Sequence, residues 1–300
     1  MNISIIIPTI NRYSDLKNTI KYLKDQSITD FEIIIIDQSD KIIFEDLTKL
    51  DNRIIHFHTE NKSASAARNQ GILKSKNDIL LFLDDDVIIQ NTNFLHYHLL
   101  PYMEDEKLSG IFGSVLELRV NQKPTLKRHI WSHNDDWGWL FFPQNYDKFA
   151  RVNSARSCNL SVRKRFAIDV GGMDENYSKG AHREEADFCF RLTKKYGSLL
   201  FSPKARLIHI GNATGGIRSW DASKRSIHAQ QHFDGALYFV FKNVALIHFG
   251  PHFISILLFF FYRKEFMKKP HLIFIAVYRL IVAIRNAIRL LLKEPKYLDS

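Results

Sequence analysis

The sequence predicts an α/β fold in which a doubly wound, mostly parallel sheet has flanking helices and is followed by a helical, membrane-associated region. Three observations predict this arrangement. Apolar runs alternate with polar, helix-compatible stretches through the first half of the chain. One of these runs, residues 79–83, ends abruptly in three aspartates. From residue 263 onward, basic side chains are interspersed with long aliphatic and aromatic stretches.

The apolar runs of the first half are predicted to be strands, which cover residues 3–7, 32–36, 54–58 and 79–83. Stretches at 15–26 and 63–73 are predicted to be helices, so strand and helix alternate as they do in a doubly wound sheet. The first run follows the start of the chain without a basic leader. We therefore expect it to be a strand rather than part of a cleaved signal peptide.

Composition limits the class of protein. A chain of 300 residues with 45% hydrophobic content can bury a full α/β core. Its two cysteines, Cys158 and Cys189, do not indicate a disulfide framework. We therefore expect a reducing, cytosolic compartment.

Asp84, Asp85 and Asp86 directly follow the fourth predicted strand. Open α/β sheets bind their ligands at the carboxyl ends of strands, and clustered carboxylates repel one another unless a positive charge lies between them. A divalent cation is the simplest such charge, and oxygen ligands on a short loop suit Mg²⁺ or Mn²⁺. A solvated acidic turn is the alternative for the triplet taken alone, and we favour the cation site.

The second half of the chain is less regular before it becomes helical again. Residues 184–192 are predicted to be a helix that ends before Gly197, followed by two short strands at 198–203 and 206–210 and a glycine-rich loop. The preceding stretch contains Trp131, Trp137 and Trp139. These indoles can stack on a bound ligand, lie against lipid or form local core, and the sequence does not choose between these roles.

The net charge of +10 suggests nucleic acid or an anionic membrane surface. We favour the membrane because the cations of residues 263–293 lie among apolar residues. On a helical wheel, Arg279, Arg285 and Arg289 fall on one side, and Ile281 and Ile288 on the other. This pattern predicts an amphipathic helix lying on the membrane in preference to one spanning it, and a helix buried against the preceding domain is the alternative. We expect two domains, 1–218 and 219–300, at the cytoplasmic face of the cell membrane, peripheral or monotopic.

Several short motifs occur in a characteristic order along residues 1–215, and no internal repeat interrupts them. They are residues 6–12 (IIPTINR), 35–39 (IIDQS), 66–71 (AARNQG), 83–86 (LDDD), 158–163 (CNLSVR) and 171–175 (GGMDE), then the acidic helix at Glu184 and finally His209. In this order the motifs resemble those of the family-2 glycosyltransferases, which are inverting enzymes of the GT-A fold that use sugar nucleotides.

The resemblance implies roles for individual side chains. Nucleotide-sugar binding falls to Pro8, Thr9, Asn11, Asp37, Arg68, Asp84 and Asp85, and metal binding to Asp86 and His209. Asp84 would face the nucleotide and Asp86 a Mn²⁺ or Mg²⁺ ion bridging the donor diphosphate. Arg68 either contacts the donor or forms a salt bridge within the protein. His209 is either a ligand or a structural histidine, whereas His56 and His58 are taken as ordinary strand residues.

Inverting transfer needs a carboxylate that takes the proton of the acceptor hydroxyl. The resemblance assigns this role to Glu185, with Glu184 as a substitute and Asp187 as a helix cap or acceptor-positioning residue. The family usually has Glu-Asp at this place, so Glu185 is one methylene longer than its counterpart. Alternatively, the three acids only stabilise a helix amino terminus.

The sequence therefore predicts metal-dependent transfer of a sugar from a nucleotide-sugar donor to a saccharide or lipid-linked saccharide, in cell-surface polysaccharide synthesis. One alternative is a sugar nucleotidyltransferase, although a glycine- and arginine- or lysine-rich triphosphate loop near the amino terminus is not visible. Another is a non-catalytic, membrane-bound protein that binds sugar nucleotides. Binding of nucleic acid is suggested by charge alone.

Overall fold

A computed structural model of the chain describes residues 1–40, 47–118, 144–177, 183–212, 216, 230–244, 246–261 and 264–298. The three tryptophans of the 119–143 stretch and the expected domain boundary at 218/219 lie outside these residues.

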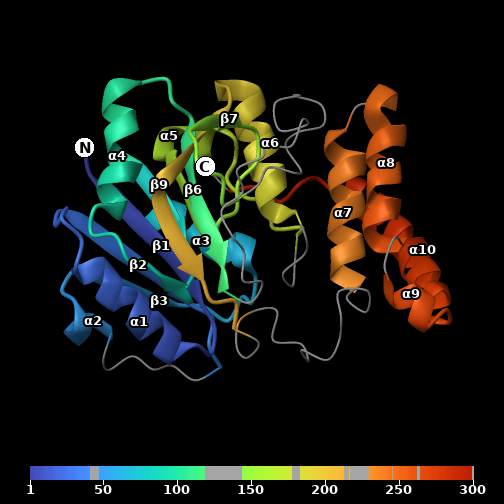
Figure 1. Cartoon of the computed structure of the whole chain (residues 1–300), viewed down its shortest axis with the longest axis horizontal. Helices are drawn as coiled ribbons and strands as arrows, with labels where there is room; N and C mark the ends of the chain where they lie inside the picture. The colour runs from blue at the N-terminus through green and yellow to red at the C-terminus, as the bar shows by residue number, and fades with distance from the viewer. Residues whose placement is uncertain are drawn as a thin grey trace.

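The described residues form one mixed sheet with helices against it (Figure 1). Its order is β3-β2-β1-β4-β8-β6-β9-β5, with β7 paired to β9. The strands are β1 (Ile3–Thr9), β2 (Phe31–Asp37), β3 (Ile54–His58), β4 (Ile79–Leu83), β5 (Val87–Ile88), β6 (Gly110–Glu117), β7 (Ala150–Val152), β8 (Asn159–Arg163) and β9 (Leu199–His209). The four predicted strands of the first half are β1 to β4, and they are parallel as expected.

The helices connect these strands and then form a separate group at the carboxyl end of the chain. They are α1 (Tyr13–Lys24), α2 (Leu47–Leu50), α3 (Ala64–Lys74), α4 (Phe94–Glu104), α5 (Lys164–Asp169), α6 (Glu184–Tyr196), α7 (Gln230–Asn243), α8 (Leu246–Phe261), α9 (Lys264–Lys268) and α10 (Leu272–Leu291). The predicted helix at 63–73 is α3, which Ser63 caps by accepting a hydrogen bond from the amide of Ala66.

The prediction of two short strands at 198–203 and 206–210 was wrong. Residues 199–209 form one continuous strand, β9. Gly113 of β6 pairs with Ser202, but Val115 pairs with Leu207, so β9 bulges between these two pairs. The bulge accommodates Pro203, which cannot donate a ladder hydrogen bond and for that reason looked like a strand end.

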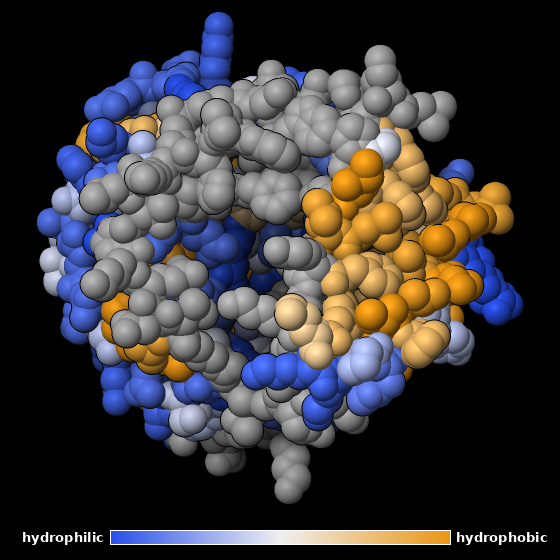
Figure 2. Space-filling model, turned by 45° about the vertical axis from the view of Figure 1, so that its right-hand side comes forward, coloured by the Kyte–Doolittle hydropathy of each residue, from blue (hydrophilic) through white to orange (hydrophobic). Residues whose placement is uncertain are grey.

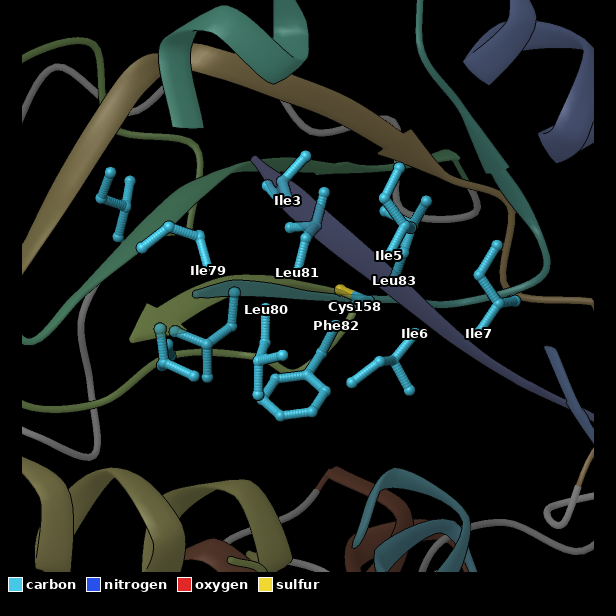
Figure 3. Packing of buried hydrophobic residues seen from close by; sticks show 14 of the residues in the cluster. Ile3, Ile5, Ile6, Ile7, Ile79, Leu80, Leu81, Phe82, Leu83 and Cys158 are labelled. Carbon is cyan, nitrogen blue, oxygen red and sulfur yellow. The ribbon is translucent and has the colours of Figure 1, made fainter. Parts of the chain in front are cut away.

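The core lies on both faces of the sheet (Figure 3). Side chains of β1 and β4 alternate, so that Ile3, Ile5 and Leu81 lie on one face and Ile6 and Phe82 on the other. All of these are fully buried. Burial of both faces explains why β4 is apolar throughout and β1 largely so.

The carboxyl-terminal helices pack on one another beside α6 (Figure 1). Four small or apolar side chains of α10 are buried against its neighbours: Leu272, Ala276, Ala283 and Ala287. The opposite side of α10 is exposed although it is largely apolar, with Phe274 and Ile281 beside Arg285. Within the described ranges, no helix combines the length and the apolar character needed to cross a bilayer.

Candidate active site

Five strand ends meet at one edge of the sheet. Strands β1, β2 and β4 are parallel, and β6 and β9 run in the same direction because β8 is antiparallel to both β4 and β6. Their carboxyl ends therefore lie along the same edge, which is where open α/β sheets hold ligands. This edge brings together Thr9, Asp37, the aspartates after β4, Glu117 and His209.

Asp84, Asp86 and His209 form a group able to hold a metal ion, since one potential ligand atom from each lies within 4.8 Å of the others. His209 Nε2 lies 3.3 Å from Asp86 Oδ1 and 3.6 Å from Asp84 Oδ2. Asp86 Oδ1 is buried, and apart from the ion pair with His209 it makes no hydrogen bond in the described part of the chain. A buried carboxylate oxygen in this condition is costly unless something binds it, so these residues fit a divalent cation.

His209 is oriented by a carboxylate behind it. Its Nδ1 lies 3.1 Å from Glu117 Oε2, and Glu117 is in turn paired with Arg156. A ring that donates from Nδ1 directs its Nε2 at Asp84 and Asp86, where a bound cation would take the place of the Nε2 proton. Burial lowers the pKa of His209, but the carboxylates of Asp86, Glu117 and Asp84 outweigh it and raise this pKa to about 9.

Glu117 has a strongly depressed pKa for the complementary reason. Burial raises the pKa of this carboxyl, but His209 and Arg156 outweigh that effect and lower it to about 2. Neither Glu117 nor Arg156 was assigned a role from the sequence. Glu117 ends the apolar run of β6, much as Asp84 follows the apolar run of β4. An acid at the end of a predicted strand could therefore have identified Glu117 as a site residue.

Arg12 forms ion pairs with Asp85 and Asp86. Its Nη1 lies 3.3 Å from Asp85 Oδ1 and 3.1 Å from Asp86 Oδ2, and its Nη2 donates to the carbonyl of Asn212. The amide of Asn212 donates to the same Asp86 Oδ2. Together these contacts leave Oδ1 as the oxygen of Asp86 that is available to a ligand. Neither Arg12 nor Asn212 was assigned a role from the sequence.

Asp85 points into the protein. It accepts a 2.7 Å hydrogen bond from Thr9 Oγ1, and only 4% of the residue is exposed. Burial raises the pKa of Asp85 to about 7, and Arg12 opposes this only in part.

A pocket of about 400 Å³ opens at the ends of β1 and β2. Thr9, Asn11 and Asp37 line it, as do Tyr13 and Ser39. Asp37 Oδ1 accepts from the amide of Ser39, and His56 lies 3.3 Å from Oδ2. Burial would raise the pKa of Asp37, but His56 and Ser39 lower it, so the carboxyl stays charged.

Pro8 is the one predicted nucleotide-binding residue of β1 that does not line this pocket. It is half-buried in the strand, where it is in register with Ile36.

Arg68 connects the aspartate cluster to α6. Its Nη2 lies 3.2 Å from Asp84 Oδ1, and its Nη1 lies 2.9 Å from Glu184 Oε1. Ser65 donates to the other oxygen of Glu184. Of the two alternatives for Arg68, the salt bridge is therefore present, and a contact with the donor remains a prediction.

The three acids of α6 have different surroundings. Glu184 and Asp187 are buried, and Asp187 pairs with Arg191 and Lys242. Glu185 is half-buried and makes no hydrogen bond or ion pair to any residue that the structure describes. Glu185 is thus the acid of this helix whose carboxylate is not committed to a protein partner, and its role as the base remains a prediction.

Comparison with known proteins agrees with this geometry. Residues 4–171, more than half of the chain, match the family described as "Glycosyl transferase family 2". An uncharacterised glycosyltransferase of Rickettsia conorii is 28% identical over 200 residues, which cover 59% of this chain and 32% of the relative. The match therefore spans about a third of the length of that protein.

Two further relatives have more specific names. The "Glucosyl-dolichyl phosphate glucuronosyltransferase" of Haloferax volcanii is 21% identical over 70% of this chain and 69% of its own. The "GalNAc(5)-diNAcBac-PP-undecaprenol beta-1,3-glucosyltransferase" of Campylobacter jejuni is 33% identical over 38% of this chain and 33% of its own.

Solved structures share the fold at low sequence identity. S. aureus TarS in complex with UDP-GlcNAc has a TM-score of 0.68 at 14% identity, covering 96% of this chain and 81% of TarS. GalNAc-T7 with UDP, GalNAc and Mn²⁺ has a TM-score of 0.58 at 16% identity, covering 80% and 47%. The mixed sheet with flanking helices is consistent with the GT-A fold. On the family match, the chain belongs to glycosyl transferase family 2.

Proposed function

We propose that the protein transfers a sugar from a nucleotide-sugar donor, with inversion, to a hydroxyl of a lipid-linked saccharide at a membrane surface. The observation that carries the proposal is the group formed by Asp84, Asp86 and His209 beside the pocket of Thr9, Asn11 and Asp37. A metal ligand set next to a pocket for a base or ribose suits a nucleoside diphosphate.

In this mechanism the nucleoside occupies the pocket at the ends of β1 and β2, where Asp37 accepts hydrogen bonds from it. Asp86 and His209, with Asp84, would hold Mn²⁺ or Mg²⁺. When bound, the cation neutralises charge that develops on the diphosphate as the anomeric bond breaks. Ion pairs with Arg12 and Arg68 hold the neighbouring aspartates in place.

Glu185 acts as the general base. It takes the proton of the acceptor hydroxyl while the hydroxyl oxygen attacks the anomeric carbon from the side opposite the diphosphate. Support comes from its half-buried position and from the absence of a competing ion pair in the described structure. Glu184 is tied to Arg68, so it is the weaker candidate for the base.

The acceptor is proposed to be lipid-linked because two relatives are named for dolichyl phosphate and PP-undecaprenol compounds. An apolar face on the carboxyl-terminal helices supports this choice (Figure 2). We define the apolar face by six exposed residues of α8, α9 and α10: Ile254, Leu258, Met267, Phe274, Tyr278 and Ile281. Exposed Lys268, Lys269, Arg285 and Arg289 lie beside them in the sequence, a mixture that suits an anionic bilayer surface.

Release of nucleoside diphosphate from a panel of nucleotide sugars, with Mn²⁺ or Mg²⁺ and after chelation, tests the proposal. We expect metal-dependent release by the wild type and none by Asp86→Ala. Binding of a sugar nucleotide without turnover for any donor would favour the non-catalytic alternative, and formation of pyrophosphate from a nucleoside triphosphate would favour the nucleotidyltransferase.

A further inference from the structure

We propose that Lys242 of α7 is a positioning residue for the reaction, because it fixes the first turn of α6, which carries Glu185, against the carboxyl-terminal helices. The inference rests on the proposed function, with Glu185 as the base.

Lys242 lies between two buried carboxylates from distant parts of the sequence. Its Nζ is 2.7 Å from Asp174 Oδ2 and 2.8 Å from Asp187 Oδ1. Both carboxylate side chains are fully buried, and the lysine side chain is 10% exposed. One ammonium group therefore joins α7, the turn after Gly172 and the first turn of α6.

Asp187 is the contact that concerns catalysis, since it lies two residues after Glu185 in the same helical turn. Its second oxygen pairs with Arg191 at 2.9 Å, and Asn243 of α7 donates to the first. Burial would raise the pKa of Asp187, but Arg191 and Lys242 lower it, so the carboxyl remains charged. Glu185 has no comparable contact within the described structure, so its place depends on how this turn is held.

Asp174 supplies the other half of the attachment. It accepts hydrogen bonds from the Tyr238 hydroxyl and from the amides of Asn176 and Lys296. The same carboxylate thus binds α7, its own turn and the carboxyl-terminal tail. Through its ion pairs with Asp174 and Asp187, Lys242 links these contacts to α6.

Aromatic rings surround the lysine and limit access of water. Its Nζ lies 4.9 Å from the ring centre of Tyr297, 5.5 Å from that of Tyr238 and 5.9 Å from that of Tyr177. Electrostatic contacts are stronger in such a site than at a surface, so the geometry that Lys242 imposes is well defined.

A balanced pair of substitutions tests the role while leaving no new buried charge. In Lys242→Met with Asp174→Asn, Asp187 keeps Arg191 as its partner, and the asparagine can still accept the backbone hydrogen bonds. Lys242→Arg keeps the charge and is the conservative variant. Lys195→Met removes a half-exposed lysine from the other end of α6, where it pairs with Asp169, and serves as the matched control.

For the donor that wild type turns over, we expect the double variant to lose ~10- to 100-fold in kcat, since a misplacement of about 1 Å costs that order of magnitude. Its KM for donor and its affinity for nucleoside diphosphate with Mn²⁺ should stay within about twofold, with cooperative unfolding retained. Lys242→Arg should recover most of kcat, and Lys195→Met should match wild type.

The inference is overturned if the double variant keeps wild-type kcat. It is also overturned if kcat, nucleotide affinity and cooperative unfolding are lost together, because that result assigns Lys242 a structural role only. A wild type that turns over no donor refutes the proposed function instead, so the two failures are distinguishable.

Discussion

Replacing Glu185 by glutamine should separate catalysis from stability more cleanly than any other change in α6. The amide keeps the shape of the side chain but cannot accept the acceptor proton. A positioned general base contributes ~10²- to 10⁴-fold, which corresponds to ~2.7–5.4 kcal/mol of transition-state stabilisation at 1.36 kcal/mol per decade.

The structure predicts almost no cost in folding for this change. Glu185 makes no hydrogen bond or ion pair to the described residues, so Glu185→Gln should alter the free energy of unfolding by no more than ~0.5 kcal/mol. Glu184→Gln is the matched comparison, because Glu184 is 3% exposed and pairs with Arg68 at 2.9 Å.

Breaking one partner of a buried ion pair costs ~3–5 kcal/mol. Because Arg68 keeps Asp84 as a second partner, we expect the lower end of this range for Glu184→Gln. At ~2–4 °C per kcal/mol for a domain of this size, its melting temperature should fall by roughly 6–12 °C.

Steady-state transfer, calorimetric binding of nucleoside diphosphate and thermal unfolding measure the three quantities. Glu185→Gln should lose kcat with unchanged nucleotide affinity and melting temperature. Near-normal transfer by Glu185→Gln, with loss of transfer but not of stability in Glu184→Gln, would show that Glu184 is the base.

Three further predictions concern the proposed metal site and the carboxyl-terminal helices. Glu117→Gln should weaken binding of Mn²⁺ by ~10- to 100-fold, as measured by electron paramagnetic resonance, because it loosens the orientation of His209; unchanged affinity would count against this arrangement. The raised pKa of His209, about 9 when folded against 6.5 for the free side chain, stabilises the metal-free protein below pH 6.5, and that contribution is lost as the pH rises from 6.5 through 9. Urea titrations of wild type and His209→Gln should therefore differ most at pH 6 and converge above pH 9, and a gap that stays constant with pH would contradict the assignment. Phe274, 78% exposed on α10, should be dispensable for folding but not for attachment to a membrane. Phe274→Asp should lower sedimentation with anionic vesicles, whereas Leu73→Asp on α3 should not. Equal sedimentation of both variants would argue against membrane attachment through the apolar face.

The sequence was sufficient for the parts of the site that depend on local pattern. An apolar run followed by Asp84, Asp85 and Asp86 is enough to predict a buried strand that ends in carboxylates, and the structure confirms that strand as β4. The acidic helix and its end at Gly197 were likewise predicted, and α6 confirms them. The same local logic was wrong about β9, where Pro203 is accommodated by a bulge that only the pairing with β6 creates.

The remaining contacts were out of reach because they join positions far apart in the sequence. Glu117 meets His209 only because β6 and β9 are adjacent and parallel. Lys242 and Asp187 are separated by 55 positions, and neither sequence neighbourhood indicates the other. Residue type identifies an available charge, but sheet order and helix packing decide which partner it has.

The helical wheel of the carboxyl-terminal region predicted amphipathicity without predicting how the helix packs. In the structure, alanines of α10 are buried in the cluster that also contains α7. The expected separation was wrong for Ile281 and Ile288, which are exposed as Arg285 and Arg289 are. The helix is thus both packed against the protein and apolar on its outer side. Association with a membrane remains a prediction.

The most direct test of the account is whether Asp86 and His209 bind a metal ion together with a diphosphate. Calorimetric titration of UDP, GDP, CDP and ADP into the protein, with Mn²⁺ and after chelation, measures this coupling. We expect one nucleotide to bind at least tenfold more tightly with Mn²⁺ in the wild type, and this difference to disappear in Asp86→Ala. Equal affinity with and without Mn²⁺ for every nucleotide that binds, or a metal effect that persists in Asp86→Ala, would contradict the account.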